Sequence, residues 1–442
     1  MRIFVIGAGQ VGTTIVEALH AEHQLTVVDT DAGRLQAVSQ RFDVTIVTGN
    51  GASRQTLVEA GVRDADLFIA CTSRDEINII SSLLSRKLAP SAKTIVRTGN
   101  VEYLHVWRER ELDFDHMVSS EEETALAISQ NIGVPAAKQT DVFAGGQVQI
   151  VELEVDSHVR HPQSIGVPLR DASLPDDSRI VGIIRGDQQI LPRGAEKIEA
   201  GDRIIVIGSP RAAREWSGLM TRGRRRVDDV VIFGAGRAGV ATARLLLKEG
   251  IGVRLIEPNA ERAREVADLL PKARVLQATG LDPEFLQRER ISQSEAAVFA
   301  MRDDAKNLYA ATLARLQGVD LTIAIAHEAV SVRVFEQAGV DVAIDPRRLT
   351  AEEIVRFAHD PRTQQVAMFE GDRYEVVDIV VRDESDLVGK PFREMPMTGT
   401  LIGAIVRDGA AFFPHGDDVL QAGDRVILFT ESRRVAEVER AL

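Results

Sequence analysis

The same glycine-rich loop occurs twice in this chain of 442 residues. Residues 5–12 read VIGAGQVG, and residues 232–239 read IFGAGRAG, so the first glycines, Gly7 and Gly234, are 227 positions apart. A single Gly-x-Gly-x-x-Gly is a weak signal, because many folds contain one. Two copies in matching surroundings indicate that a whole unit was duplicated, and the chain must therefore fold as repeated domains.

A carboxylate follows each loop after a second apolar run. Asp29 lies 22 residues beyond Gly7, and Glu257 lies 23 residues beyond Gly234. Dinucleotide-binding folds place a ribose-binding acid about 20 residues beyond the first glycine, and the pyrophosphate lies at the N-terminus of the intervening helix. Each half therefore predicts a nucleotide site. Tight turns that bind nothing remain the alternative.

The rest of each half repeats in the same order. Apolar strand patterns alternate with helical patterns, which predicts two α/β units with doubly wound, mostly parallel sheets of the Rossmann type. Residues 147–155 and 374–381 then alternate apolar and polar side chains, as half-buried strands do. Ala-Gly-Asp-Arg recurs at 200–203 and 422–425. We predict a Rossmann domain at 1–125, a small α+β, β-rich domain at 140–222, and their repeats at 228–350 and 365–442.

Composition narrows the function further. The net charge of −13 disfavours nucleic acid as a partner, because binding to a phosphate backbone needs surplus Lys and Arg. The basic cluster from Arg222 to Arg226 is interpreted as a solvated linker. Cys71 is the only cysteine, which excludes a disulfide framework and favours the cytoplasm. No apolar run reaches the roughly 20 residues that span a bilayer, and the first residues read as a strand rather than a signal peptide.

The two halves differ at positions that would face a ligand. Gln10 in the first loop corresponds to Arg237 in the second, where an added positive charge would suit a terminal phosphate. Arg97 ends a predicted strand of the first half, but its counterpart is Ile325, so one cationic contact is lost. Surface salt bridges are the alternative role for both arginines. Different ligands, or one weakened site, follow from these differences.

No catalytic centre is visible in the sequence. The nine histidines do not recur between the halves, and Arg193, for example, is replaced by His415. The run Glu121 to Glu123 is interpreted as an exposed first turn of a helix rather than a metal site. We therefore predict no catalytic and no metal-binding residues. An NAD(P)-dependent oxidoreductase with one active half is the second hypothesis, and a scaffold that binds no nucleotide is the third.

The order of Rossmann unit and small unit, repeated once, resembles the TrkA family of tandem regulator-of-potassium-conductance (RCK, or KTN) modules. The resemblance covers essentially the whole chain. It implies a cytosolic, ring-forming regulatory subunit, a dimer or tetramer of tandem modules, that binds NAD or NADH and ATP or ADP. It also implies an integral membrane potassium-transporting partner of the TrkH or TrkG kind, with this chain peripheral on the inner face of the cell membrane.

The resemblance also assigns contacts by position. Phosphate contacts fall on Gly7, Gly9, Gly12, Gly234, Gly236 and Gly239. Ribose contacts fall on Asp29 and Glu257, with Asp31 and Asn259 close by. Further contacts fall on Asn50, Ala52, Thr72, Glu76 and Arg97. The neighbouring positions Gln10, Val11, Thr30, Arg237 and Ala238 complete the candidate cofactor-binding set. The chain departs from the related pattern Gly-Asp-Ala, because residues 49–52 read GNGA and residues 280–282 read GLD.

Overall fold

The structure is a computed structural model that describes most of the chain. The described residues are 1–134, 137–156, 161, 163–186, 188–220, 227–355, 363–369, 373–395 and 399–442. The predicted basic linker from Arg222 to Arg226 lies outside them. The chain divides into two compact units: Met1–Thr124 with Asp345–His359, and Ala125–Ile344 with Asp360–Leu442. Each unit is described by itself.

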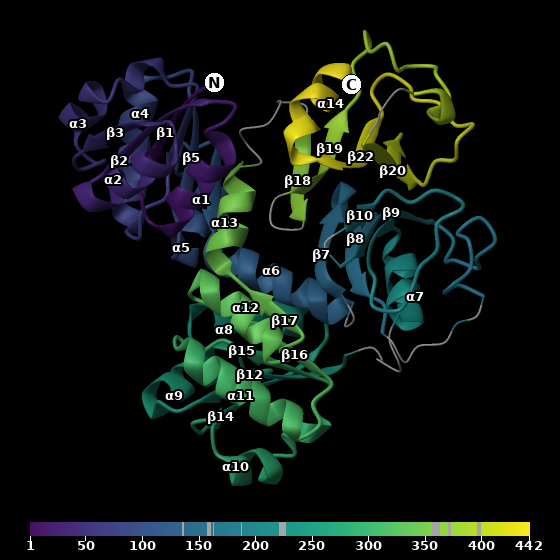
Figure 1. The fold of residues 1–442 in the computed structure, drawn as a ribbon. Coiled ribbons are helices and arrows are strands. Elements are labelled where there is room, and N and C mark those ends of the chain that lie inside the picture. The colour runs from purple at the N-terminus through teal and green to yellow at the C-terminus, as the bar shows by residue number, and fades with distance from the viewer. Residues whose placement is uncertain are drawn as a thin grey trace. The chain divides into compact units, whose positions relative to one another are not determined.

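The first half begins with a parallel six-stranded sheet in the order β3-β2-β1-β4-β5-β6 (Figure 1). Its strands are β1 (Arg2–Ile6), β2 (Gln24–Asp29), β3 (Thr45–Thr48), β4 (Leu67–Ala70), β5 (Lys93–Thr98) and β6 (His116–Ser119). Its helices are α1 (Gln10–Leu19), α2 (Ala32–Arg41), α3 (Arg54–Glu59), α4 (Asp75–Leu88) and α5 (Val101–Arg108). The strand order reverses between β1 and β4, and ligands of such sheets bind beyond the carboxyl ends of the strands at that point.

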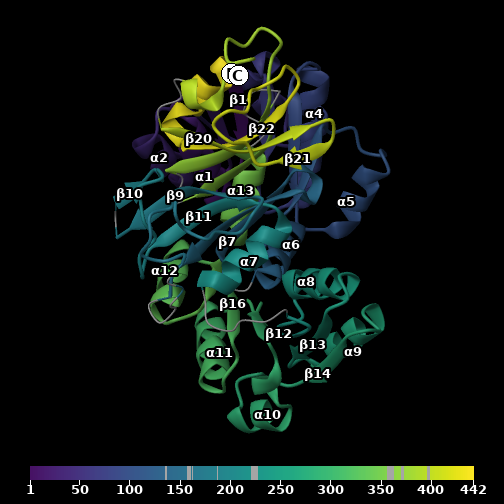
Figure 2. The ribbon, with the colours of Figure 1, turned by 90° about the vertical axis from the view of Figure 1, so that its right-hand side faces the viewer.

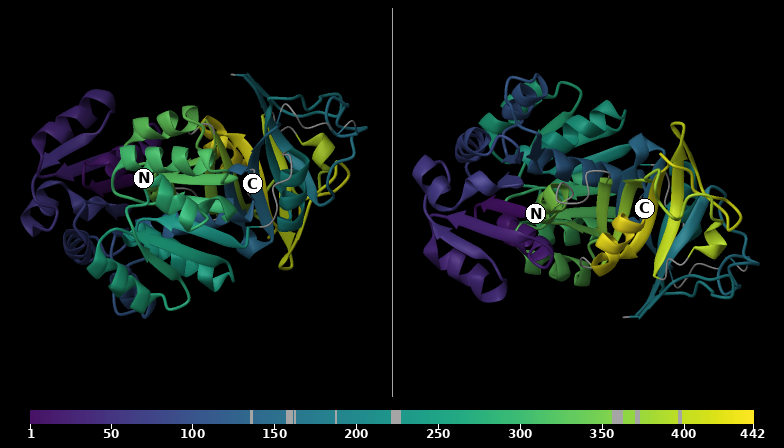
Figure 3. Two further views of the ribbon diagram at one scale, coloured as in Figure 1. Left: turned by 90° about the horizontal axis from the view of Figure 1, so that it is seen from below. Right: turned by 90° about the horizontal axis from the view of Figure 1, so that it is seen from above.

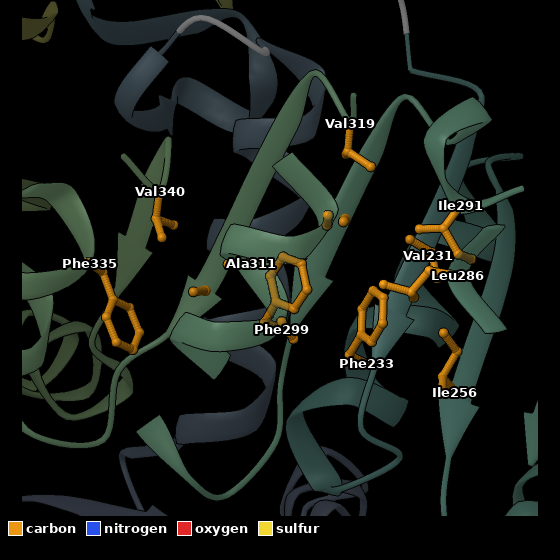
Figure 4. Packing of buried hydrophobic residues seen from close by; sticks show 14 of the residues in the cluster. Val231, Phe233, Ile256, Leu286, Ile291, Phe299, Ala311, Val319, Phe335 and Val340 are labelled. Carbon is orange, nitrogen blue, oxygen red and sulfur yellow. The ribbon is translucent and has the colours of Figure 1, made fainter. Parts of the chain in front are cut away.

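The second half repeats this sheet in the order β14-β13-β12-β15-β16-β17. Its strands are β12 (Asp229–Phe233), β13 (Gly252–Glu257), β14 (Arg274–Gln277), β15 (Ala296–Phe299), β16 (Leu321–Ile325) and β17 (Val342–Ile344). Its helices are α8 (Arg237–Lys248), α9 (Ala260–Leu269), α10 (Pro283–Arg288), α11 (Asp304–Leu316) and α12 (Ala329–Gln337). Phe233 and Phe299 stack in its core with ring centroids 4.8 Å apart (Figure 4). The predicted α/β fold class is confirmed.

An antiparallel five-stranded sheet follows each parallel sheet. The first contains β7 (Ala137–Phe143), β8 (Val148–Glu154), β9 (Ser178–Arg185), β10 (Gln188–Ile190) and β11 (Arg203–Gly208). In the chain, α6 (Ser120–Gly133) precedes this sheet and α7 (Pro210–Met220) follows it. The second contains β18 (Thr363–Phe369), β19 (Tyr374–Val380), β20 (Thr400–Arg407), β21 (Ala410–Phe412) and β22 (Arg425–Glu431), and α14 (Val435–Ala441) follows it. The two sheets lie face to face (Figures 2 and 3).

The expectation of half-buried strands at 147–155 and 374–381 is wrong. Six of the seven residues of β8 and five of the seven of β19 are buried. One face of β8 packs against the other small sheet through Val148 and Ile150, and the opposite face packs against α7 through Val151 and Leu153. Both faces are covered, so alternation in the sequence did not mean alternation in exposure.

The repeated Ala-Gly-Asp-Arg turns are held by matching ion pairs. Asp202, which is 1% exposed, accepts hydrogen bonds from Arg185 Nε and Nη2 and from the backbone N–H of Glu199, each at 2.8 Å. Asp424 makes the corresponding three contacts with Arg407 and Gln421, also at 2.8 Å. A two-point arginine–carboxylate bond fixes geometry as well as charge, and it explains why both turns keep the acid.

A helix from the second half belongs to the first compact unit. Helix α13 (Pro346–Val355) follows β17 after the single residue Asp345, and it packs against α1 and β6 (Figure 1). Ala351, Ile354 and Val355 are buried there. The glycine-loop helix of the first half is therefore covered by residues that lie more than 300 positions later in the sequence.

We predict that Asp202→Ala lowers the free energy of unfolding by about 3 kcal/mol, because the substitution leaves the Arg185 guanidinium and the Glu199 N–H without their shared acceptor. Urea denaturation measures the change. The control is Asp171→Ala, which breaks an exposed pair with Arg170 in the same domain and should cost under about 0.5 kcal/mol. Equal losses in the two variants would contradict this assignment.

Candidate functional site

The first glycine loop forms a tight turn between β1 and α1. Gly7 has φ +113°, a conformation that L side chains rarely adopt. A Cβ on Gly12 would lie 1.9 Å from the Gly7 carbonyl oxygen, so helix and strand approach too closely for any side chain at this position. Gly9, in contrast, has φ −75°, and a Cβ added to it would have no heavy atom within 4 Å apart from those of its neighbours in the chain. The space beside Gly9 is open.

The N-terminus of α1 faces this open space. Gly9 is the N-cap residue and no side chain caps the helix. The first N–H groups of a helix have no partner within the helix, and the positive end of the helix dipole adds to their attraction for anions. The turn therefore has the geometry of a phosphate cradle, and Gly236 at the start of α8 repeats it.

Asp29 ties the end of β2 to the glycine loop. Its Oδ2 accepts from the N–H of Ala8 at 2.7 Å, and its Oδ1 accepts from the N–H of Asp31 at 2.9 Å. Asp31 in turn caps α2 by accepting from the N–H groups of Gly33 and Arg34. Each carboxylate oxygen has a further lone pair, so Asp29 can hold the loop and still accept a bond from a ribose hydroxyl.

Glu257 does the same in the second half. Its Oε2 accepts from the N–H of Ala235 at 3.0 Å and its Oε1 from the N–H of Asn259 at 2.9 Å, while Asn259 caps α9. Gly234 has φ +105°, a positive value like the +113° of Gly7. Both predicted acids thus lie against the predicted loops, through the same two kinds of bond.

Asn78 joins the ends of β4 and β5 beside the loop. This buried side chain donates to the carbonyls of Thr72 and Arg97 at 3.0 and 2.9 Å and accepts from the N–H of Thr72 at 2.9 Å. Asn307 makes the corresponding contacts with Met301 and Ile325. Sequence analysis did not propose either asparagine as a site residue, although their recurrence 229 positions apart was available as a signal.

Arg97 lies at the edge of the first site, half buried. Its Nε donates to Ser120 Oγ at 3.1 Å and its Nη1 to the Thr72 carbonyl at 3.3 Å. It is therefore held by neutral oxygens that an anionic ligand could replace, since bonds between charged groups are stronger. These contacts differ from the surface salt bridge that was the alternative for this residue.

His327 occupies the corresponding place in the second half. Ile325 is buried, as its apolar side chain requires, but His327 Nε2 lies 2.9 Å from the carbonyl oxygen of Met301, the counterpart of Thr72. The loss of one cationic contact at this position stays a prediction. Arg262 is a cation near the second loop, where its Nε donates to the Ala235 carbonyl at 2.9 Å. Neither residue was a sequence candidate.

The remaining candidates lie around these centres. Asn50 Oδ1 accepts from the N–H of Ala52 at 2.9 Å, which shapes the loop after β3. Val11 is buried on α1, and Ala238 is partly buried on α8. Gln10, Thr30, Glu76 and Arg237 are exposed at the ends of the elements that surround the two sites. Their roles as ligand contacts stay predictions.

Cys71 lies beneath the first loop. Its Sγ is 3.5 Å from the carbonyl oxygen of Ile6, and burial is the main cause that raises the pKa of this thiol to about 12. Nearby Arg97 lowers the pKa and Asp29 raises it, each by less than burial. A neutral, buried thiol serves packing rather than nucleophilic chemistry.

Glu121 to Glu123 fall in the first turn of α6, as predicted, and are partly buried rather than exposed. Among the described residues, no three His, Cys, Asp or Glu side chains are grouped so as to hold a metal ion. No helix in the described part of the chain has the length and apolar character needed to cross a bilayer.

Comparison with known proteins gives two kinds of match. Family models described as the TrkA-N domain match residues 3–120 and 230–346, and those described as the TrkA-C domain match residues 159–217 and 376–442. A Trk system potassium uptake protein TrkA homolog of Archaeoglobus fulgidus is 33% identical over 99% of both chains. Trk system potassium uptake protein TrkA of Halomonas elongata is 31% identical over 100% of this chain and 98% of its own.

Solved structures share the fold at lower identity. The GsuK channel bound to NAD matches 100% of this chain and 79% of its own with a TM-score of 0.60 and 19% identity. GsuK bound to ADP matches 81% of this chain and 70% of its own with a TM-score of 0.50 and 14% identity.

The two glycines of the first loop give a matched pair of variants. We predict that Gly9→Ala keeps the melting temperature near that of the wild type, because the added methyl group meets open space, but weakens nucleotide binding on the order of tenfold or more by filling the cradle. Gly12→Ala should lower both stability and binding through its clash with Gly7. Thermal unfolding and titration with NADH and ADP measure the two effects. Wild-type affinity in Gly9→Ala would show that no phosphate approaches this glycine.

The Cys71 thiol should resist alkylation in the folded protein. Its folded pKa is raised from 9.0 to about 12, so the thiolate fraction at about pH 8 falls about a thousandfold. The associated stability is fully present below pH 9 and is lost as the pH rises toward 12. Iodoacetamide labelling followed by mass spectrometry, with the urea-unfolded chain as control, checks this. Equal rates in the folded and unfolded chains would contradict the burial of the thiol.

Proposed function

Because the chain belongs to the TrkA family, we propose that it is a nucleotide-sensing regulatory subunit of a potassium uptake system. NAD or NADH and ATP or ADP are its regulatory ligands, and it acts at the inner face of the membrane on an integral potassium-transporting subunit. The observation that carries the proposal is the paired loop and acid, Ala8 with Asp29 and Ala235 with Glu257, present once in each half. GsuK, which shares the fold, is a channel bound to NAD in one structure and bound to ADP in another, and this supports the choice of ligands.

The physical basis of such regulation is differential binding. A nucleotide shifts a conformational equilibrium only by the difference between its affinities for the two states, commonly 1–3 kcal/mol. No covalent chemistry is required of the protein. The two unequal sites, one with Arg97 and one with His327 and Arg262, are suited to respond to different nucleotides or to the same nucleotide with different affinities.

A nicotinamide-dependent oxidoreductase is the second candidate. Such an enzyme needs a group that handles a proton beside the substrate. Among the described residues, His327 is the histidine that lies at an expected ligand edge, and it contacts a backbone carbonyl there. The Asp304 carboxylate near it accepts from the backbone N–H groups of His327 and Glu328. This arrangement favours structural support over proton transfer.

The decisive test is a binding screen with NAD, NADH, ATP and ADP. We expect Asp29→Asn to weaken binding at the first site, and Glu257→Gln at the second, on the order of tenfold, because each variant keeps only one acceptor oxygen for two backbone N–H groups and a ribose. Asn100→Ala is the control, since it removes the cap of α5 and lies outside the candidate set. Isothermal titration measures the affinities.

Each contrary outcome points to a different reading. Unchanged affinities in both acid variants would reject the site assignment. A wild-type chain that binds none of the four nucleotides would favour a scaffold. Substrate-dependent change in NADH absorbance would favour the oxidoreductase. A chain that neither assembles into a ring nor alters potassium flux through its co-expressed membrane subunit would reject the regulatory role.

A further inference from the structure

A line of hydroxyl groups leads from the first site to α13. Arg97 Nε donates to Ser120 Oγ at 3.1 Å, and Ser120 Oγ lies 2.9 Å from Thr350 Oγ1. Thr350 Oγ1 also donates to the carbonyl oxygen of Pro346 at 2.7 Å. Thr350 is fully buried and Ser120 is 7% exposed, so these bonds are shielded from water. All four residues belong to the first compact unit.

Ser120 Oγ is the shared acceptor of this line. It accepts from Arg97 Nε on one side and from Thr350 Oγ1 on the other. The Thr350 hydroxyl has one proton, which is shared between Ser120 Oγ and the Pro346 carbonyl. Arg97 therefore helps to hold the Ser120 hydroxyl in the position in which it accepts from α13.

The line ends on a helix that is joined closely to the second half. Only Asp345 separates α13 from β17, and the Asp345 side chain accepts from the N–H groups of Arg347 and Arg348 at the start of α13. β17 is hydrogen-bonded to β16 in the second parallel sheet. Helix α13 and the edge strand β17 of the second sheet are thus consecutive in the chain.

The described residues of the second half form no equivalent line. Where Arg97 stands in the first half, Ile325 stands in the second, and where Ser120 begins α6, Pro346 begins α13. Ile and Pro supply no side-chain hydrogen bond. Thr124 of α6 is the counterpart of Thr350, is equally buried, and donates to the Ser120 carbonyl at 2.6 Å within its own helix. The polar connection is thus confined to the first site.

We propose that the Arg97–Ser120–Thr350 line couples occupancy of the first site to the docking of α13, an inference that rests on the proposed nucleotide binding. Arg97 also contacts the Thr72 carbonyl, at the switch point of the sheet where a phosphate would lie. A bound phosphate competes for the guanidinium with a charge-assisted bond, which is stronger than the bond to Ser120. Arg97 then leaves Ser120, the Ser120 hydroxyl is no longer held in the position that accepts from Thr350, and α13 is held less firmly.

Hydrogen exchange on the full-length chain tests the coupling. We expect saturating ADP or NADH to speed exchange of the amides in 346–355 on the order of fivefold, the effect of about one net hydrogen bond. Thr350→Val removes the hydroxyl at nearly constant volume, so this helix should exchange faster without ligand and no longer respond to it. Thr350→Ser should restore the response. Thr124→Val is the matched control, since it removes an equivalent intrahelical bond outside the line and should leave the response intact.

Two outcomes would overturn the coupling: a wild-type response in Thr350→Val that still binds the probe, or loss of the response in Thr124→Val as well. If the wild-type chain binds neither ADP nor NADH, the proposed function fails. The connection between Arg97 and α13 is then tested by hydrogen exchange on the ligand-free protein. Arg97→Ala should then speed exchange of 346–355 in the wild-type background but not in Thr350→Val. Additive effects of these two substitutions would reject the line itself.

Discussion

The bond between an acid and a glycine-loop amide is the interaction on which both nucleotide-binding units depend. Asp29 bonds to Ala8, and Glu257 bonds to Ala235. In each case the carboxylate at the end of the second strand fixes the turn that follows the first strand, so the turn keeps its open side toward the helix N-terminus. The same carboxylate is the group expected to read a ribose. The turn and the expected ribose contact thus share one residue, and a neutral amide substitution, which keeps only one acceptor oxygen, affects both.

The parts that the sequence predicted are those set by short-range geometry. The glycine loops, the two acids and the alternation of strands and helices follow from local spacing, and the duplication tests each of them against a second copy. Burial of β8 did not follow, because Gln149 and Glu152 are polar and yet buried. Gln149 donates to Thr140, and Glu152 accepts from Arg203 on the neighbouring strand. Paired polar groups can lie inside, and no pattern of single residues reveals their partners.

Aligning the two halves residue by residue also did not reveal how their binding sites differ. Alignment pairs Arg97 with Ile325 and suggests a simple loss. In space, His327 reaches the same carbonyl position from two residues farther along the chain. The backbone scaffold, held by Asn78 and Asn307, is the constant part, and the side chains that approach it come from different positions. The two sites of a duplicated protein are therefore compared more reliably by asking which side chain contacts a given backbone atom than by asking which residues align in the sequence.

Helix α13 comes from the second half of the chain but packs within the first compact unit. It contacts α1, the helix that follows the first glycine loop, and its residues Ala351, Ile354 and Val355 are buried. The first Rossmann unit is therefore complete only with chain that follows the second parallel sheet. Duplication alone would give two self-contained domains, whereas a helix supplied by one half and packed in the other makes the first domain depend on the second half for its own packing.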